Sequence, residues 1–502
     1  MQKIISDVVV VGGGLAGMYA ALAARKQGCK VVIICKNKTG RSGSSVVAQT
    51  VHRVAKQDPL NQKLYYEFFR ESGRFMGNPE LIKTLISEGP SAVNHVISLG
   101  VQFKKGIETL PNGGEIVRYS CEPRIGKLLT SPVAEHVRNS DICLLENTMV
   151  IDVISQSGKL NGLVCLCNNE VFLVIAKAVI LATGGFSRIF KETSNPMGIT
   201  GDGQAIAARA GARLTGLEFI QFYPYRLSQP KIFDLNPAIF DQGAIFINEK
   251  KERFMQNFPK AEQENRDRLA QEMFKQHEVF LDLSGMSQKD LDKHPILADL
   301  VKHGYGSRLK MQVTAHFSMG GIQINSECET DIPGLFACGE CTGGIHGANR
   351  LAGSALVECA VFGPRAGRSA AIYAQKNKAQ ISTSPAIDLP PLGKDDIHTL
   401  VSSLRQLMWA KAGVQRSENN LLQCRSELLG LSEKLTHLQP SSYQQWFEAK
   451  NMLQISKSVV ESALARRETR GSHLRIDYPN ENMKGGDMAI FRSDTMNSLS
   501  QS

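Results

Sequence analysis

The residues of this chain with the clearest chemical purpose are the glycines of the sequence GGGLAG, residues 12–17. Gly12, Gly14 and Gly17 have the spacing of a loop that binds the pyrophosphate of a dinucleotide. The first glycine allows a sharp turn, the second lets phosphate approach the backbone, and the third lets a helix pack close to a strand. A helix that follows the loop would present free N–H groups and its positive dipole end to the phosphates. The loop therefore predicts a bound dinucleotide, and a glycine-rich turn without a ligand is the alternative.

The loop needs a strand before it and a helix after it, and the sequence predicts both. Residues 8–11 are four consecutive valines, which is typical of a buried strand. Residues 18–27 are predicted to form a helix, and residues 30–34 a second strand, which together start a β-α-β nucleotide-binding fold. Further along, Asn78 and Pro79 predict the start of another helix that ends near Leu99.

The end of the second predicted strand bears on which dinucleotide binds. An acidic residue usually stands there and holds a ribose hydroxyl, but this chain has Cys35 and Lys36. Two further apolar strands end in small residues, at 178–185 and at 334–340, and the last of these carries Glu340. One nucleotide motif and two distant strand ends favour a single long cofactor, FAD, over NAD.

Length and composition describe a globular protein with room for two or three domains. The chain has 502 residues, of which 42% are hydrophobic and 21% are charged. No apolar run reaches the roughly 18 residues that span a bilayer, and no signal-peptide pattern precedes the first strand, so we expect a cytoplasmic protein. The net charge of +10 is spread along the chain. This argues against nucleic-acid binding and favours attraction of anionic substrates or an acidic partner.

The chain has eleven irregularly spaced cysteines, and this odd number without a secretory signal pattern predicts free thiols in a reducing compartment. Cys338 and Cys341 form a CxxC sequence on the predicted flavin turn, where they are either small buried residues or, alternatively, a metal or redox pair. The sequence has no haem or iron–sulfur pattern, so no metal site is predicted and any such centre would lie on another chain.

Several ordered motifs give the chain a family resemblance. They are GGGLAG at 12–17, RSGSSVVAQ at 41–49, TGG at 183–185, TGDG at 200–203, NRD at 265–267, HFSMGG at 316–321, GE at 339–340, GANRLAG at 347–353 and ARRETRGSH at 465–473. With these motifs, residues 1 to about 478 resemble the flavoprotein subunit of the fumarate reductase/succinate dehydrogenase family, which includes L-aspartate oxidase.

The resemblance implies an α/β fold in which a Rossmann-like FAD-binding domain is interrupted by an α+β capping domain. We expect the FAD-binding domain at residues 1–215 and 316–384, and the capping domain, which would hold the substrate, at 216–315. Pro385 to Pro391 is predicted to be a linker. Apolar residues at helical spacing predict a C-terminal three-helix bundle at 393–478, and an extended tail is predicted at 479–502.

By the resemblance, FAD would be bound without a covalent bond. Ser44 stands where respiratory members of the family have the histidine that is attached to the flavin, and an ordinary turn is the other interpretation of this serine. The residues implied as cofactor-binding are Gly12, Gly13, Gly14, Ala16, Gly17, Lys36, Ser42, Ser44, Ala48, Gln49, Thr183, Gly184, Asp202, Glu340, Ala355 and Leu356.

The resemblance also implies a catalytic arginine and a carboxylate clamp. Arg266, with Asp267 beside it, matches the arginine that moves a proton to or from substrate carbon. Arg268 is an alternative in register, and a charge pair on a surface helix is the non-catalytic interpretation. His316 and Arg350 match the residues that grip one substrate carboxylate, for which an arginine offers a bidentate fork.

The opposite end of the implied pocket departs from the family pattern. The family has a His-Pro-Thr-Gly run that holds the second carboxylate, whereas this chain has Tyr223 and Tyr225 in place of the histidine and the threonine. A Thr-Glu pair falls here on Asn236-Pro237, and a further glutamate becomes Gln242. A buried carboxylate without a charged or strongly donating partner costs on the order of several kcal/mol. We therefore expect Tyr223, Tyr225 and Gln242 to contact a substrate whose far end is not a simple carboxylate, unless the tyrosines are only core residues.

The expected function is an FAD-dependent oxidoreductase that transfers a hydride between flavin N5 and a carboxylic acid, at a C–C or C–N bond. One alternative is an amino-acid oxidase similar to L-aspartate oxidase. Another is a flavin-binding electron-transfer or structural subunit of a larger complex. The expected partners are the small acid and an iron–sulfur or other electron-transfer subunit, through which the protein would lie at a membrane surface.

Overall fold

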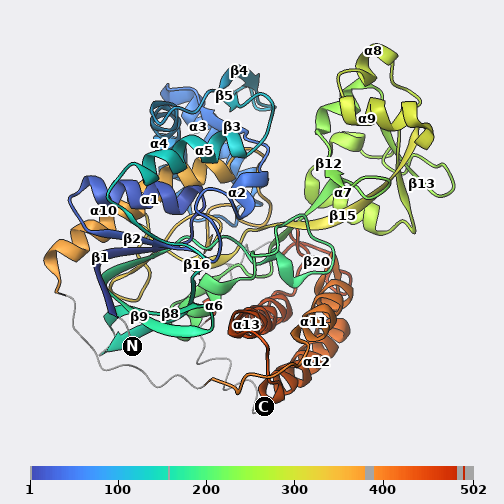
Figure 1. The fold of residues 1–502 in the computed structure, drawn as a ribbon. Coiled ribbons are helices and arrows are strands. Elements are labelled where there is room, and N and C mark those ends of the chain that lie inside the picture. The colour runs from blue at the N-terminus through green and yellow to red at the C-terminus, as the bar shows by residue number, and fades with distance from the viewer. Residues whose placement is uncertain (1–2, 157–158, 379–388, 483–489, 492–502) are drawn as a thin grey trace.

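The computed structural model describes residues 3–156, 159–378, 389–482 and 490–491. Its centre is a seven-stranded sheet that carries the nucleotide-binding topology (Figure 1). The strand order is β6-β2-β1-β9-β8-β7, and β17 pairs with β9. The strands are β1 (Lys3–Val11), β2 (Val31–Ile34), β6 (Cys143–Leu145), β7 (Met149–Gln156), β8 (Lys159–Cys167), β9 (Glu170–Leu181) and β17 (Leu335–Ala337).

The parallel part of this sheet follows directly from the valine run. Val8 to Val11 pair with Val31–Ile34 on one side and with Ala178–Leu181 on the other, and all of these residues are buried. Strands that are covered on both faces are continuous apolar runs rather than alternating ones. Helices α1 (Leu15–Lys26) and α10 (Ala355–Lys376) pack against each other over this sheet (Figure 1). Helix α1 begins earlier than the predicted Met18, because Gly14 is already its extended N-cap residue.

A small lobe, drawn mainly above α1 and α10 in Figure 1, contains three strands and four helices. Its antiparallel sheet has the order β3-β5-β4. The elements are β3 (His52–Ala55), β4 (Lys104–Thr109), β5 (Glu115–Ser120), α2 (Ser44–Val47), α3 (Pro59–Ser72), α4 (Pro79–Ser98) and α5 (Lys127–Arg138). Helix α4 confirms the predicted start, because the side chain of Asn78 accepts hydrogen bonds from the N–H groups of Glu80 and Leu81.

The segment predicted as the capping domain contains a five-stranded sheet in the order β12-β11-β15-β14-β13, at the upper right of Figure 1. Its strands are β11 (Ile220–Leu227), β12 (Phe233–Asp234), β13 (Ile245–Asn248), β14 (Val279–Asp282) and β15 (Arg308–Ser318). Its helices are η2 (Pro237–Gln242), η3 (Ala261–Gln263), α7 (Arg266–Phe274), α8 (Gln288–Leu291), α9 (Pro295–Leu300) and η4 (Val301–Tyr305). The domain boundaries stay predictions, and the one after residue 315 falls inside β15.

The C-terminal region contains three helices that pack on one another, α11 (Ile397–Ala412), α12 (Glu418–His437) and α13 (Tyr443–Ala465). Helix α6 (Asp202–Arg209) contacts α13. The remaining elements are η1 (Ser187–Ile189), the pair β19 (Gln415–Arg416) and β20 (Leu474–Arg475), and the sheet of β18 (Thr342–Gly343), β16 (Gly321–Gln323), β10 (Leu214–Thr215) and β21 (Ile490–Phe491). Together these regions confirm the predicted fold class, an α/β nucleotide-binding fold with an inserted cap and a helical C-terminal region. Most of the predicted linker and tail lies outside the described residues.

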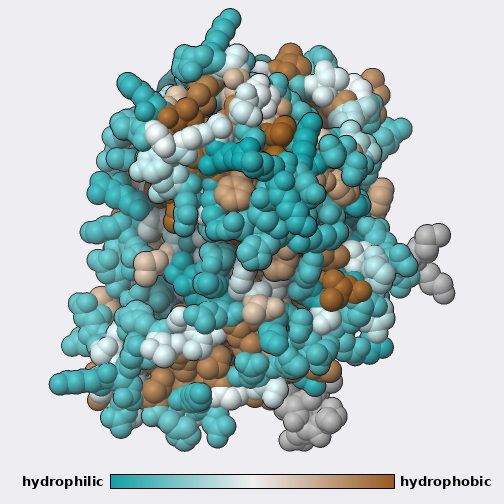
Figure 2. Space-filling model, turned by 90° about the vertical axis from the view of Figure 1, so that its right-hand side faces the viewer, coloured by the Kyte–Doolittle hydropathy of each residue, from teal (hydrophilic) through white to brown (hydrophobic). Residues whose placement is uncertain are grey.

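The described helices include none that is long and apolar enough to cross a membrane. The face shown in Figure 2 is mainly hydrophilic, with hydrophobic residues in separate groups.

Candidate active site

One large cavity joins the glycine loop to the residues expected to bind substrate. Its volume is about 1560 Å³, which exceeds the roughly 300–1,000 Å³ of a typical single ligand pocket. Its lining includes the glycine loop, residues 41–51, part of β11 in the cap, and the loop that carries Arg350. The central sheet, the lobe and the cap therefore border one space that has room for both a cofactor and a substrate.

Within the glycine loop, two glycines shape the backbone and one leaves room beside it. Gly12 has a φ of +117°, and a Cβ there would lie 2.2 Å from the carbonyl oxygen of Ala182. A Cβ on Gly17 would lie 2.0 Å from the carbonyl oxygen of Gly12. A Cβ on Gly14 would instead meet Ser45 Oγ at 3.4 Å, an ordinary contact. The fold itself thus requires glycine at 12 and 17, whereas Gly14 keeps the approach to the backbone open for a ligand.

The predicted cofactor-binding residues come together around the cavity, with Gly17 as the exception, since it is buried against Gly12. The lining side chains include Thr183, whose buried hydroxyl has no hydrogen-bond partner among the described residues. An unpaired buried hydroxyl is costly, and a polar group of a cofactor would satisfy it. The carboxylate of Glu340 accepts a hydrogen bond from the N–H of Ser318 at 3.1 Å, and burial raises its pKa to about 7. These features fit FAD.

Two of these residues already have strong partners within the protein. Lys36 Nζ lies 2.7 Å from Asp202 Oδ2 and 2.8 Å from Glu448 Oε1, and the two carboxylates raise the pKa of the lysine although burial opposes them. Ser44 Oγ donates to the side-chain oxygen of Asn195 at 2.8 Å. The Lys36 ion pairs therefore join the end of β2 to α6 and α13 at the edge of the cavity.

The substrate half of the cavity holds two arginines that form no ion pair with any described residue. Arg350 is 7% exposed, and its guanidinium donates to the side-chain oxygen of Gln221 at 2.7 and 3.1 Å. It also lies 4.6 Å from the centre of the Phe317 ring. Arg266, the first residue of α7, lies 5.0 Å from the centre of the Tyr223 ring. Burial, together with the charge of Arg266, lowers the pKa of Arg350 to about 9. Two cations in one desolvated space favour an anion between them.

His316 on β15 completes this group. Its ring stacks on Tyr223 with 4.6 Å between ring centres, and its Nδ1 lies 2.7 Å from Ser194 Oγ. Burial lowers the pKa of His316 well below its usual value, and the charges of Arg350 and Arg266 lower it further. The imidazole is therefore neutral near pH 7. When Ser194 donates to Nδ1, the proton lies on Nε2, which can then donate to a ligand.

Two predicted site residues are not brought together with the others. Asp267 is buried, but its carboxylate accepts from Arg74 at 2.8 Å and does not pair with Arg266. Adjacent helix residues point in different directions, so Arg266 faces the cavity while Asp267 does not line it. Gln242 lies outside the cavity lining as well, with its Oε1 2.7 Å from Nε2 of His294.

Sequence reasoning missed a charged pair in the part of the cavity lining that β11 and β12 form, which we call the far wall. Arg226 Nη1 and Asp234 Oδ1 are 2.7 Å apart, and both residues line the cavity beside Tyr223 and Tyr225. The strands β11 and β12 place Arg226 directly opposite Asp234. Opposite charges on facing positions of a hairpin were the available signal. Tyr223 and Tyr225 are buried, and the hydroxyl of Tyr223 donates to the carbonyl oxygen of Leu235 at 3.2 Å.

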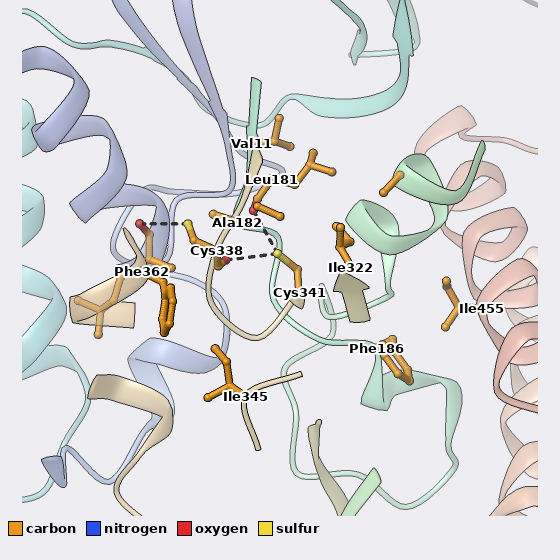
Figure 3. Packing of buried hydrophobic residues seen from close by; sticks show 14 of the residues in the cluster. Val11, Leu181, Ala182, Phe186, Ile322, Cys338, Cys341, Ile345, Phe362 and Ile455 are labelled. Carbon is orange, nitrogen blue, oxygen red and sulfur yellow. Dashed lines mark hydrogen bonds between the residues drawn. The ribbon is translucent and has the colours of Figure 1, made fainter. Parts of the chain in front are cut away.

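Of the two cysteines of the CxxC sequence, Cys338 lines the cavity and Cys341 does not. Cys341 Sγ donates to the carbonyl oxygen of Leu181 at 3.1 Å and to that of Cys338 at 3.3 Å (Figure 3). Burial raises the pKa of both thiols, that of Cys341 to about 12. Both thiols are therefore protonated at neutral pH. Among the described residues, no group of His, Cys, Asp and Glu is arranged to hold a metal ion.

Comparison with known proteins gives two family matches and several relatives that extend over most of the chain. The FAD binding domain family matches residues 7–356, and the family "Fumarate reductase flavoprotein C-term" matches residues 401–497. An uncharacterized FAD-dependent oxidoreductase of Methanocaldococcus jannaschii is 32% identical, with 94% of each chain covered. One subunit of the fumarate reductase (CoM/CoB) of Methanothermobacter marburgensis is 30% identical, and the L-aspartate oxidase of Synechocystis is 29% identical, again with 94% of each chain covered. The FrdA chain of Escherichia coli quinol fumarate reductase has the same fold, with a TM-score of 0.85 at 24% identity over 98% of this chain and 97% of that chain.

The nucleotide-binding sheet, its glycine loop and the matching domain define a flavoprotein oxidoreductase whose cofactor is FAD. The chain belongs to the fumarate reductase/succinate dehydrogenase flavoprotein family, which also includes the L-aspartate oxidases. The predicted family, enzyme class and cofactor are thereby confirmed.

Proposed function

We propose that this enzyme oxidises or reduces a carboxylic acid at a C–C or C–N bond, with FAD held non-covalently and one substrate carboxylate gripped by Arg350 and His316. The observation that carries the proposal is the pair of arginines, Arg266 and Arg350, that face one cavity without forming an ion pair with any described residue. An anion is the ligand that such a site favours.

Arg350 is suited to hold the carboxylate in a fixed orientation. Its guanidinium is planar and can donate two parallel hydrogen bonds to a carboxylate. Gln221 holds it from one side, and the Phe317 ring lies against it. A pKa of about 9 keeps it charged near pH 7. His316 would add a neutral N–H donor to the same carboxylate.

Arg266 is proposed to move a proton to or from the substrate carbon. Arginine is a poor acid in water because its pKa is about 12 or higher, so this role requires a crowded site from which water is excluded. The packing of Arg266 against Tyr223 supports such a site. FAD, when bound, supplies the hydride acceptor or donor. No covalent bond to the flavin is proposed, because Ser44 has no imidazole nitrogen and its hydroxyl bonds to Asn195.

The far wall favours a substrate end that is not a simple carboxylate. Arg226 is neutralised by Asp234, and the neighbouring Tyr223 and Tyr225 offer neutral hydroxyls and broad apolar faces. This wall would leave a carboxylate poorly compensated. An amide, a ketone, an aromatic group or a larger acid is compatible with it.

The test of the proposed function is turnover and flavin reduction with a panel of carboxylic acids. Purified holoenzyme should reduce or reoxidise its flavin with at least one acid, and Arg350→Gln should slow this reaction at least about 10²-fold while retaining bound flavin. Arg268→Gln, which removes an arginine that packs on Phe258, is the matched control and should behave as wild type. Efficient turnover of succinate or fumarate at low concentration would contradict the altered far wall. Failure of every acid to affect the flavin would favour an electron-transfer or structural subunit instead.

An amino-acid oxidase is the second candidate, supported by Asp234. Its carboxylate lies in the cavity lining and could accept a hydrogen bond from a substrate amine, as in an oxidation at a C–N bond. Hydrogen peroxide formation with a panel of amino acids would distinguish this candidate, and Asp234→Asn should then lower the activity. Absence of peroxide with all amino acids would exclude it.

We also propose an electron-transfer partner, through which the enzyme could lie at a membrane surface. The support is the name of the 30%-identical relative, which is one of the subunits of a fumarate reductase. Slow reoxidation of the reduced flavin by oxygen and fast reoxidation by a one-electron dye would agree with such a partner. Fast reoxidation by oxygen alone would contradict it.

A further inference from the structure

A cluster of arginines in the lobe also lines the cavity. It is separate from Arg350 and His316, the residues proposed to bind the substrate carboxylate. Arg53 on β3, Arg118 on β5 and Arg124 just after β5 line the cavity together with one carboxylate, that of Glu108 on β4. Glu108 is shared: its Oε2 lies 2.7 Å from Arg53 Nε, and its Oε1 lies 3.3 Å from Arg118 Nε.

Glu122, which is exposed and lies outside the cavity lining, also acts on Arg124, so two carboxylates oppose three guanidinium groups and one positive charge is left over. Arg124 is half-buried and forms neither a hydrogen bond nor an ion pair with the part of the chain that the structure describes. Burial and the charges of Arg118 and Arg53 lower the pKa of Arg124, although Glu122 and Glu108 oppose them. Like charges that are partly shielded from water repel one another, and an added anion removes that repulsion.

The cluster is connected to the loop that carries Arg350. The backbone N–H of Arg53 donates to the carbonyl oxygen of Gly353 at 3.1 Å, and its Nη1 donates to that of Ala352 at 3.1 Å. These two carbonyls follow Arg350 closely in the same loop, between β18 and α10. The cluster is therefore fixed, through Arg53, to the loop that carries Arg350, two and three residues beyond it.

We propose that Arg53, Arg118 and Arg124 form a subsite for a second anionic group, such as a carboxylate or a phosphonate, at the distal end of the substrate acid. This inference rests on the proposed function and narrows its substrate class to acids with two anionic ends. Arg350 holds the carboxylate at the reacting end, and the lobe holds the distal anion. The subsite also explains why a charge-neutral far wall in the cap is compatible with a doubly charged substrate.

The test compares matched ligands on the holoenzyme. The probes are the straight-chain diacids from glutarate to suberate and, for each, the monoamide of the same length, measured by flavin difference spectra and by calorimetry at low salt. At least one diacid should bind about tenfold or more tightly than its monoamide, since a hydrogen bond to a charged group contributes about 1.5–3 kcal/mol. Arg124→Gln should remove that preference while binding of the monoamide stays the same.

Two further variants separate a direct contact from a general charge effect. Lys105→Gln removes one positive charge from an exposed position on β4 outside the cavity lining, and it should keep the preference. Glu108→Gln removes the competing carboxylate and should increase the preference. Arg124 is the main target because it has no partner to lose, and flavin content and the unfolding midpoint verify that each variant is folded.

Several results would overturn the subsite. If diacids and monoamides bind equally and in an Arg350-dependent manner, the subsite is wrong and the proposed function stands. If neither class of ligand binds, the grip itself is wrong and the subsite falls with it. If Arg124→Gln weakens FAD binding but keeps the diacid preference, the cluster serves the cofactor. If Lys105→Gln and Arg124→Gln lower the preference equally, the effect is long-range charge and not a site.

Discussion

The glycine loop and the substrate half of the cavity border the same space but are built in different ways. We call the group Arg266, His316 and Arg350 the arginine-lined wall, which is distinct from the far wall of the cap. The loop requires glycine because the backbone leaves no room for a side chain. A Cβ at Gly12 would overlap the carbonyl oxygen of Ala182 at the end of β9, and a Cβ at Gly17 would overlap that of Gly12. The wall depends on side chains that converge from separate elements: Arg266 from α7, His316 from β15, and Arg350 from the loop after β18. A local backbone requirement leaves a short, strict sequence pattern. Convergent side chains leave only scattered residues, whose partners decide what they can do.

The largest expected effect separates the two regions. Arg350→Gln should lower kcat/KM for the acid substrate about 10²- to 10⁴-fold, because loss of one partner of a buried charge pair costs about 3–5 kcal/mol. The flavin should remain bound, since Arg350 is not part of the glycine loop. Steady-state kinetics with flavin absorbance measures both. Loss of flavin together with activity would show that the two regions are not independent.

A second pair of variants sharpens the account of the loop. Gly12→Ala should lower the free energy of unfolding by about 2–4 kcal/mol, because of its positive φ and the overlap with Ala182. Gly14→Ala should leave stability within about 1 kcal/mol and weaken FAD binding instead. Thermal unfolding and FAD titration distinguish these outcomes. Equal destabilisation by both changes would mean that the fold requires Gly14 just as it requires Gly12, and that Gly14 is not kept for ligand binding.

Two buried histidines, His316 of the arginine-lined wall and His52 of the lobe, should make the stability depend on pH. Burial lowers the pKa of His52 from 6.5 to about 4, and it lowers that of His316 well below 6.5. The unfolded chain then binds more protons than the folded chain between about pH 6.5 and pH 4, so stability falls as the pH falls through this window. Each such group contributes a slope of up to about 1.4 kcal/mol per pH unit.

His52→Gln should flatten this acid loss of stability without affecting acid binding at pH 7, whereas His316→Gln should affect both. Urea unfolding at pH 7 and pH 5 provides the measurement. An unchanged pH slope in His52→Gln would contradict a neutral buried imidazole in the lobe.

The smallest effect concerns the contact between the cap and the lobe. Asp267→Asn breaks the ion pair with Arg74, which joins α7 to the segment after α3. The expected loss is about 1–2 kcal/mol of stability, less than for a fully buried pair, because the Arg74 side chain is 31% exposed. If Asp267→Asn lowers kcat strongly while the protein stays folded, Asp267 acts on Arg266 directly, which is the catalytic role that the sequence suggested.

Local patterns predicted much of the fold. The valine run and glycine loop fixed the position of β1 and α1, and Asn78 with Pro79 marked the start of α4. The ion-pair partners of charged residues could not be predicted in the same way, because they are distant in sequence. Asp267 pairs with Arg74, which is 193 residues away, and not with the adjacent Arg266.

By itself, the sequence determined the dinucleotide loop, the central parallel strands and the family, because each is encoded in contiguous residues with strict steric or apolar requirements. Only the tertiary structure decided which charges are neutralised and which are left facing the cavity. Arg226 is paired across a hairpin and Lys36 across two helices, while Arg266 and Arg350 face the cavity. The physical reason is that ion pairing depends on distances of a few ångströms between segments that the chain brings together only on folding.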